Sequence, residues 1–322
     1  MVPPARNFAR LVPITATVRY SIPNRVNVTV FVAQVCASLA CLAIASRLQG
    51  TWMLVPAVVF AFVMQTGFSL LHEAEHKKLH ASRRLNDLMG FIVAAIFPGS
   101  YSFMTLAHLS HHKKNRADAE LVDYVRPHEN PAVKAVQYYL LICGFIWLGT
   151  TLASIAIALV PMRWLERRVK QSGAAAEYLQ FVLDAKPSRV RAEMIIVALT
   201  WATLAWSLSL TWTAWAVCYG AFAFSWASQQ YVYHIRSPRH LIEGAYDLKL
   251  TRPLQWLYLN FNFHLQHHRH VNVPWIYMAQ MTGEEPTRHY WPTYVALFLP
   301  PQPVEEAWPR AHQTHGPVPL KA

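Results

Sequence analysis

Residues 52–76, WMLVPAVVFAFVMQTGFSLLHEAEH, join an uncharged apolar run to a histidine motif. The part from 52 to 71 has no formal charge and is about the ~20 residues that a helix needs to cross a bilayer core of about 30 Å. Directly after it, His72 and His76 stand four positions apart, which places both imidazoles on one face of a helix. The stretch therefore predicts a membrane-spanning helix that ends in two potential metal ligands.

The composition of the whole chain is that of a membrane protein. Of its 322 residues 54% are hydrophobic and only 14% are charged, which makes a soluble globular domain an unexpected class. The 29 Lys and Arg against 17 Asp and Glu give a formal charge of +12. Because the cations lie in the breaks between apolar runs, they indicate loops against anionic lipid, and no nucleic-acid partner is expected.

The apolar runs predict an all-α integral membrane bundle of about four transmembrane helices with a cytoplasmic histidine-rich cap. Residues 26–46 and 52–71 form the first two crossings, and 194–233, which carry no formal charge, form a hairpin of two more. Residues 135–162 are long enough to span. The cations on both sides of that run favour a re-entrant or interfacial pair of short helices, with a single crossing as the alternative.

No internal repeat or linker divides the chain, so one membrane domain is expected. The expected parts are a basic N-terminal segment (1–25), the membrane domain with three histidine boxes (26–282) and a proline-rich C-terminal tail (283–322). Cations before the first and after the second crossing place both ends of this helix pair, and the histidine boxes, on the cytoplasmic side. No cleavable signal peptide is expected. The lack of organelle-retention signals and the compact length favour a bacterial inner membrane as the location.

Two further histidine motifs follow the first. Residues 108–112 read HLSHH and residues 264–268 read HLQHH. Helical spacing makes each box present two or three imidazoles toward one point. Eight such nitrogens exceed the needs of a tetrahedral zinc ion, while imidazole also suits iron, copper and nickel. Two metal ions are therefore expected, and redox chemistry with O₂ favours iron because zinc has no accessible second oxidation state.

The order HxxxH, HxxHH, HxxHH resembles that of the membrane fatty-acid desaturases and their relatives, the alkane and carotenoid hydroxylases. The resemblance covers roughly residues 52–275. It implies a further ligand about thirty residues before the last box, a place that His234 occupies. Gln230, one helical turn earlier, matches the position of an amide that holds a metal-bound water, although the family more often has Asn there. The implied metal ligands and catalytic residues are His72, His76, His108, His111, His112, His234, His264, His267 and His268.

Acids near the boxes are candidates to orient the ligands, since ligating imidazoles usually donate their other N–H to a carboxylate or carbonyl. Asp118 is the preferred candidate because it follows the second box at a spacing where the family commonly has an acid; its alternative role is an exposed loop acid that pairs with Arg116. The other acids close in sequence are Glu73, Glu75 and Glu120. His80 continues the face of the first box but has no counterpart in the family pattern.

The resemblance implies an O₂-dependent di-iron fatty acyl desaturase that introduces a double bond into a lipid acyl chain. A hydroxylase and a terminal-alkene-forming fatty acid decarboxylase remain alternatives, because the three reactions diverge only after the first hydrogen is removed. The chain has no cysteine set for an iron–sulfur cluster, no flavin glycine fingerprint and no fused cytochrome domain. A separate ferredoxin, rubredoxin or cytochrome-type electron donor is therefore implied.

One alternative belongs to another reaction class. His72, Glu73 and His76 also satisfy HExxH, in which two histidines hold zinc and the glutamate acts as general base for peptide hydrolysis. An intramembrane zinc metalloprotease would leave the other two boxes without a role. A metal transporter would place its ligands near the middle of the spans, whereas here the boxes follow the spans.

Overall fold

The computed structural model describes residues 20–118, 120–171, 180–283 and 285–304. Within these ranges the chain is almost entirely helical, and its two short strands, β1 (Tyr124–Val125) and β2 (Gln302–Pro303), pair in parallel. The expected all-α class is therefore confirmed. Residues 1–19 of the N-terminal segment and residues 284 and 305–322 of the tail lie outside the described residues, and the division into parts stays a prediction.

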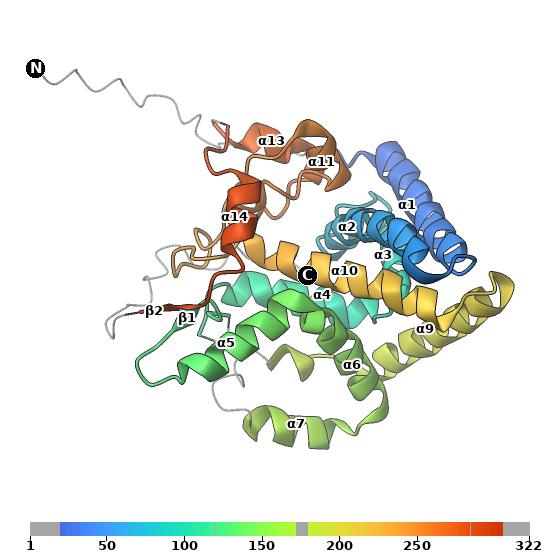
Figure 1. Cartoon of the computed structure of the whole chain (residues 1–322), viewed down its shortest axis with the longest axis horizontal. Helices are drawn as coiled ribbons and strands as arrows, with labels where there is room; N and C mark the ends of the chain where they lie inside the picture. Colours follow the sequence, from blue (N-terminus) through green and yellow to red (C-terminus); the bar gives the residue numbers. More distant parts are fainter. Residues whose placement is uncertain (1–19, 119, 172–179, 284, 305–322) are drawn as a thin grey trace, which may run out of the picture.

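The helices surround α2, which packs between α1 and α10 (Figure 1). In chain order they are α1 (Asn24–Ala45), α2 (Leu54–Glu75), α3 (Arg83–Ile96), α4 (Tyr101–Lys114), α5 (Pro131–Leu140), α6 (Ile146–Leu159), α7 (Met162–Gln171), α9 (Pro187–Ser207), α10 (Trp212–Val232), α11 (Arg252–Leu257), α12 (His264–Arg269), α13 (Met278–Met281) and α14 (Tyr290–Ala296). Short helical turns lie at η1 (Gly50–Met53), η2 (Leu141–Phe145), η4 (Gln180–Val182) and η5 (Trp275–Tyr277).

Among the described residues, four helical stretches are long and apolar enough to cross a membrane, which is the number that the sequence predicts. They are Asn24–Ala45, Gly50–Glu75, Pro131–Leu159 and Pro187–Ser207. Helix α10 is not among them, although it belongs to the expected hairpin. It carries tryptophan, tyrosine, serine and glutamine, and about half of its residues, including both Ser228 and Gln229, are buried inside the bundle. These polar residues lower its hydropathy without exposing it to lipid.

The connectivity shows how these stretches are arranged. The Thr211 N–H donates to Ser46 Oγ at 3.0 Å, so the turn between α9 and α10 lies beside the turn between α1 and α2. From there α2 and α10 both run to histidines of the site, His72 and His234. Helix α9 brings the chain back to that turn. Helices α3 and α4 are bent by 95° against each other, and this pair starts and ends near histidine boxes. The stretch 131–159 is long and apolar enough for a single crossing, which is the alternative that the sequence left open.

Residues 131–159 contain a local break in the middle of the stretch. Helices α5 and α6 are separated by the π-helical turn η2, where Gly144 has φ +117°. This conformation favours glycine. A Cβ at this position would also lie 3.1 Å from the carbonyl carbon of Ala223, so the glycine lets the turn pack closely on α10. Two short helices joined at Gly144 are therefore present, while their re-entrant or interfacial course stays a prediction.

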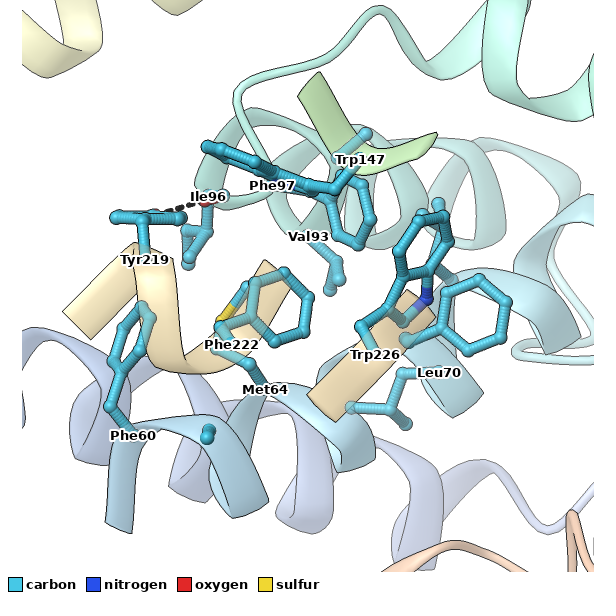
Figure 2. Close-up of a cluster of buried hydrophobic side chains, with 14 of the residues drawn as sticks. Phe60, Met64, Leu70, Val93, Ile96, Phe97, Trp147, Tyr219, Phe222 and Trp226 are labelled. Carbon is cyan, nitrogen blue, oxygen red and sulfur yellow. Dashed lines mark hydrogen bonds between the residues drawn. The ribbon is translucent and has the colours of Figure 1, made fainter. Parts of the chain in front are cut away.

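The largest hydrophobic cluster joins α2, α3 and α10 (Figure 2). Phe60, Phe97 and Phe222 have no exposed surface, and Phe222 makes edge-on ring contacts with Phe60 at 6.3 Å and with Phe97 at 5.2 Å. The Tyr219 hydroxyl donates to the carbonyl of Ile96, which satisfies a carbonyl at the end of α3. This packing fixes the helix whose end carries the first histidine box.

A buried carboxylate holds the helix that carries the second box. Glu193 of α9 is 8% exposed, and its Oε2 accepts hydrogen bonds from Ser100 Oγ at 2.5 Å, Ser102 N at 3.0 Å and Ser102 Oγ at 2.9 Å. These groups form the first turn of α4, where a negative charge is favourable against the helix dipole. A long-range contact thus fixes the start of α4.

A buried ion pair ties the loop after α4 to the end of α10. Arg116 Nη1 lies 3.0 Å from Asp123 Oδ1, with both side chains 1% exposed. The Tyr231 hydroxyl donates to the same oxygen at 2.7 Å, and the Arg236 N–H donates to Asp123 Oδ2 at 2.6 Å. Asp123 is therefore fully paired, and its partners lie on both sides of His234.

Replacing Asp123 by Asn should destabilise the protein strongly. The change leaves the buried Arg116 charge without its partner, which typically costs about 3–5 kcal/mol. We expect a clear fall in the midpoint of thermal unfolding of the detergent-purified protein. Glu166→Gln, in the exposed pair of Glu166 with Lys170, is the control and should leave the midpoint unchanged. Equal midpoints for the two variants would contradict the assigned role of Asp123.

Candidate metal centre

The three histidine boxes lie on short helical segments that meet at one end of the bundle. His72 is in the last turn of α2 and His76 caps that helix; the second box ends α4, and the third forms α12. His234 follows the end of α10 by two residues. All nine expected ligands are thus brought together, in two groups.

The first group contains five histidines, whose candidate ligand nitrogens all lie within 4.8 Å of one another. Nε2 of His108 lies 2.7 Å from Nε2 of His76 and 3.0 Å from Nε2 of His112. The His112 nitrogen in turn lies 3.0 Å from Nε2 of His267. The first group consists of His72, His76, His108, His112 and His267.

The second group contains four histidines with the same spacing of nitrogens. Nε2 of His264 lies 3.0 Å from Nε2 of His234 and 3.2 Å from Nε2 of His268. The ring of His111 completes it, with its centroid 4.9 Å from that of His234. The second group consists of His111, His234, His264 and His268.

Each HxxHH box is divided between the two groups. In α4, His108 and His112 join the first group while His111 joins the second; in α12, His264 and His268 join the second group while His267 joins the first. In both boxes the i and i+4 side chains share a group and i+3 points to the other. The sequence predicted that all imidazoles of one box converge on a single point. In the structure the imidazoles of each HxxHH box are instead directed to two adjoining points between the helices.

The donor set fits two metal ions. At a metal–imidazole distance of about 2.1 Å, neighbouring ligands at right angles lie about 3 Å apart, which is the spacing seen in both groups. Nε2 of His72 is buried without a hydrogen-bond partner among the described residues, as expected of an atom that awaits a cation. Burial lowers the pKa of His264, His267 and His268 well below the usual value, which favours the neutral, metal-binding form.

Neighbouring oxygens orient two ligands of the second group. Nδ1 of His234 lies 2.7 Å from the carbonyl oxygen of Gly244; since a carbonyl only accepts, this nitrogen donates and Nε2 is left for a metal. Nδ1 of His111 lies 3.0 Å from Oε1 of Glu120. Asp118, the sequence's preferred acid, pairs instead with Arg126 at 2.9 Å and with Arg239. The structure therefore offers Glu120 for the orienting role.

The third box is held by an acid that sequence reasoning missed. Asp247 Oδ1 accepts from the Gln266 N–H at 3.1 Å, and Oδ2 accepts from Gln266 Nε2 at 2.9 Å. These bonds fix α12 through the residue between its ligands. Asp247 lies 17 positions before His264, a separation that carries no helical signal, so the contact could not be found from spacing.

Two other residues singled out by the sequence have clear positions. Nδ1 of His80 accepts from the Ser82 N–H at 2.9 Å, and His80 belongs to neither group. Nε2 of Gln230 is buried without a partner among the described residues. A buried amide donor of this kind indicates an ordered water or another small acceptor, which fits the water-holding role implied for Gln230.

Fold and site together define an all-α, membrane-type protein with two adjoining histidine centres. A family model described as fatty acid desaturase matches residues 50–300, which is most of the chain and includes all three boxes. The chain therefore belongs to the fatty acid desaturase family, whose members are membrane-bound, iron-dependent oxidoreductases that act on fatty acids. Among curated proteins, no match to the chain was found.

Glu120→Gln should weaken metal binding at the second group. Loss of an orienting carboxylate typically reduces metal affinity about 10- to 100-fold, and we expect this shift in a chelator-competition titration. Asp118→Asn is the matched control, because Asp118 follows the same box but pairs with arginines. An Asp118→Asn variant that loses affinity as much as Glu120→Gln would contradict the assignment.

Proposed function

We propose that the protein is an O₂-dependent fatty acyl desaturase that holds two iron ions, one in each histidine group, and introduces a double bond into a lipid acyl chain. The observation that carries this proposal is the division of nine histidines, six buried and three partly buried, into groups of five and four. When bound, the irons supply the O₂-dependent oxidation of an unactivated C–H bond. A single zinc site would leave one whole group unused.

The chain's own residues provide orientation and exclusion of water. Glu120 and Gly244 fix the rings of His111 and His234, and Asp247 fixes α12 beside them. His72, His264 and His268 are all at most 5% exposed, so the ligands lie in a site of low dielectric. Gln230 holds a water at its buried amide. Such pre-organisation lets one bond of a flexible chain be held beside the metals.

The contacts of Glu73 argue against the protease alternative. Its Oε2 accepts from the Trp275 N–H at 3.1 Å, which commits the carboxylate to holding the segment after the third box. In a zinc protease this glutamate would be the general base and would need to reach a metal-bound water. Its two neighbouring histidines are also joined by three from other boxes. Both findings favour the oxidase.

The setting of the reaction completes the proposal. The histidine groups face the cytoplasm, because the chain around them is rich in Lys and Arg, and the membrane is a bacterial inner membrane. Two electrons per turnover come from a separate ferredoxin, rubredoxin or cytochrome-type carrier, whose acidic surface the net charge of +12 attracts at low salt. Hydroxylation and terminal-alkene formation are the alternatives that use the same site.

Metal content and products test this function together. We expect about two irons per chain and, in cells fed fatty acids of defined length, products that mass spectrometry shows to have lost two hydrogens. His76→Ala and His268→Ala should each lower the iron content and abolish the product, whereas His80→Ala should change neither. A hydroxylated product, or a hydrocarbon one carbon shorter, would replace desaturation by the corresponding alternative. One bound zinc and no iron would overturn the proposal.

A further inference from the structure

Aromatic rings lead from the second histidine group to the surface of α14. Tyr233 has no exposed surface, and its ring centroid lies 5.1 Å from that of His264. Tyr290 lies 6.4 Å from Tyr233, and Trp291 lies 5.1 Å from Tyr290. Each step is within the range of direct ring contact. Trp291 is 51% exposed, so three residues connect a candidate metal ligand to the surface.

The chemistry of the first ring distinguishes this path from the other aromatic residues at the site. Among the described residues, the rings other than histidine that contact the nine site histidines are those of Phe68, Phe261 and Tyr233. Tyrosine and tryptophan can lose an electron to a strong oxidant, whereas phenylalanine resists this. Phe68 and Phe261 therefore do not supply electrons to the site. Tyr233 is the ring through which the protein can pass an electron to an oxidant at the site.

The position of α14 continues the path without a gap. This helix packs against the end of α10 (Figure 1), and Tyr290 is buried with Tyr233 in one hydrophobic cluster. Both phenols are buried, with Tyr233 0% and Tyr290 3% exposed. Trp291, in contrast, lies at the surface of the chain, where its oxidation needs water as a proton acceptor and as a reactant.

We propose that Tyr233, Tyr290 and Trp291 form a protective electron route, which delivers electrons to the site when an oxidant reacts there without a C–H bond in place. The inference rests on the proposed oxygen-dependent function. The exposed tryptophan is then oxidised in place of the histidine ligands. The route differs from the physiological electron supply, because tyrosine and tryptophan yield electrons only to strong oxidants.

Hydrogen peroxide serves as the probe oxidant, and the electrons balance. One peroxide takes up two electrons and two protons and gives two waters. Trp291 releases two electrons through Tyr290 and Tyr233, releases two protons to solvent, and gains one oxygen atom from water. The net reaction consumes one peroxide, adds one oxygen to Trp291 and forms one water.

The test is an oxidation map of the full-length, iron-loaded protein without fatty acid, treated with hydrogen peroxide and digested for mass spectrometry. Trp256 is the internal control, because it is 55% exposed and, among the described residues, its ring contacts only Trp275. We expect Trp291 to gain oxygen several-fold more than Trp256. Protein kept free of iron should lose this preference.

Two matched variants interrupt or spare the path. Tyr290→Phe keeps a ring in place but removes the oxidisable phenol, so oxidation of Trp291 should fall to the level of Trp256. Tyr294→Phe removes a phenol that stacks on Tyr290 at 5.7 Å but leaves the direct contact of Tyr290 with Trp291, so the preference should persist.

The outcomes separate failure of the route from failure of the proposed function. Equal oxidation of Trp291 and Trp256 in iron-loaded protein, or a preference that survives in Tyr290→Phe or without iron, would overturn the route. The iron content of the same sample is the second readout. A protein that binds no iron would overturn the proposed function together with the route.

Discussion

The convergence of nine imidazoles is the constraint on which the rest of the structure depends. Their nitrogens approach to 2.7–3.2 Å in both groups, although neutral rings cannot all donate to and accept from one another. Under the proposed function, metal ions supply the attraction that such packing needs. Because ligands from four separate segments must meet, the free energy of metal binding is also free energy of folding, and a site of this kind stabilises the bundle that forms it.

Carboxylates distant in sequence hold three of the four ligand-bearing segments in place. Glu193 fixes the start of α4, Asp247 fixes α12, and Asp123 fixes the chain around His234. A buried carboxylate is costly unless it is paired or accepts several hydrogen bonds, and each of these three accepts at least two. The acids therefore act as positioning groups, and the residues that contact metal can all remain neutral histidines.

The sequence predicted features that depend on local spacing and missed those that depend on the relative placement of helices. The eight histidines of the three boxes were identified because i, i+3 and i+4 spacing is local, whereas His234 was identified only from the family resemblance. Their division into two groups depends on how α4 faces α12, which no spacing records. Glu120 rather than Asp118 contacts His111 because the loop turns at Arg116, a residue with φ +59°. The polar residues that lower the hydropathy of α10 are compatible with its position because the helix is buried against α2. This burial is also a tertiary property.

Burial of the site explains why protection must come through the protein itself. Water is excluded so that the oxidising chemistry is confined to a C–H bond, and the same exclusion keeps soluble reductants away from the ligands. Phenylalanine at the contacts of His72 resists oxidation, but a site sealed only by such rings would leave its own histidines as the nearest source of electrons. Under this proposal Tyr233 beside His264 gives the site another source of electrons. The residue that is oxidised is the exposed Trp291, where the change disturbs neither ligand geometry nor packing.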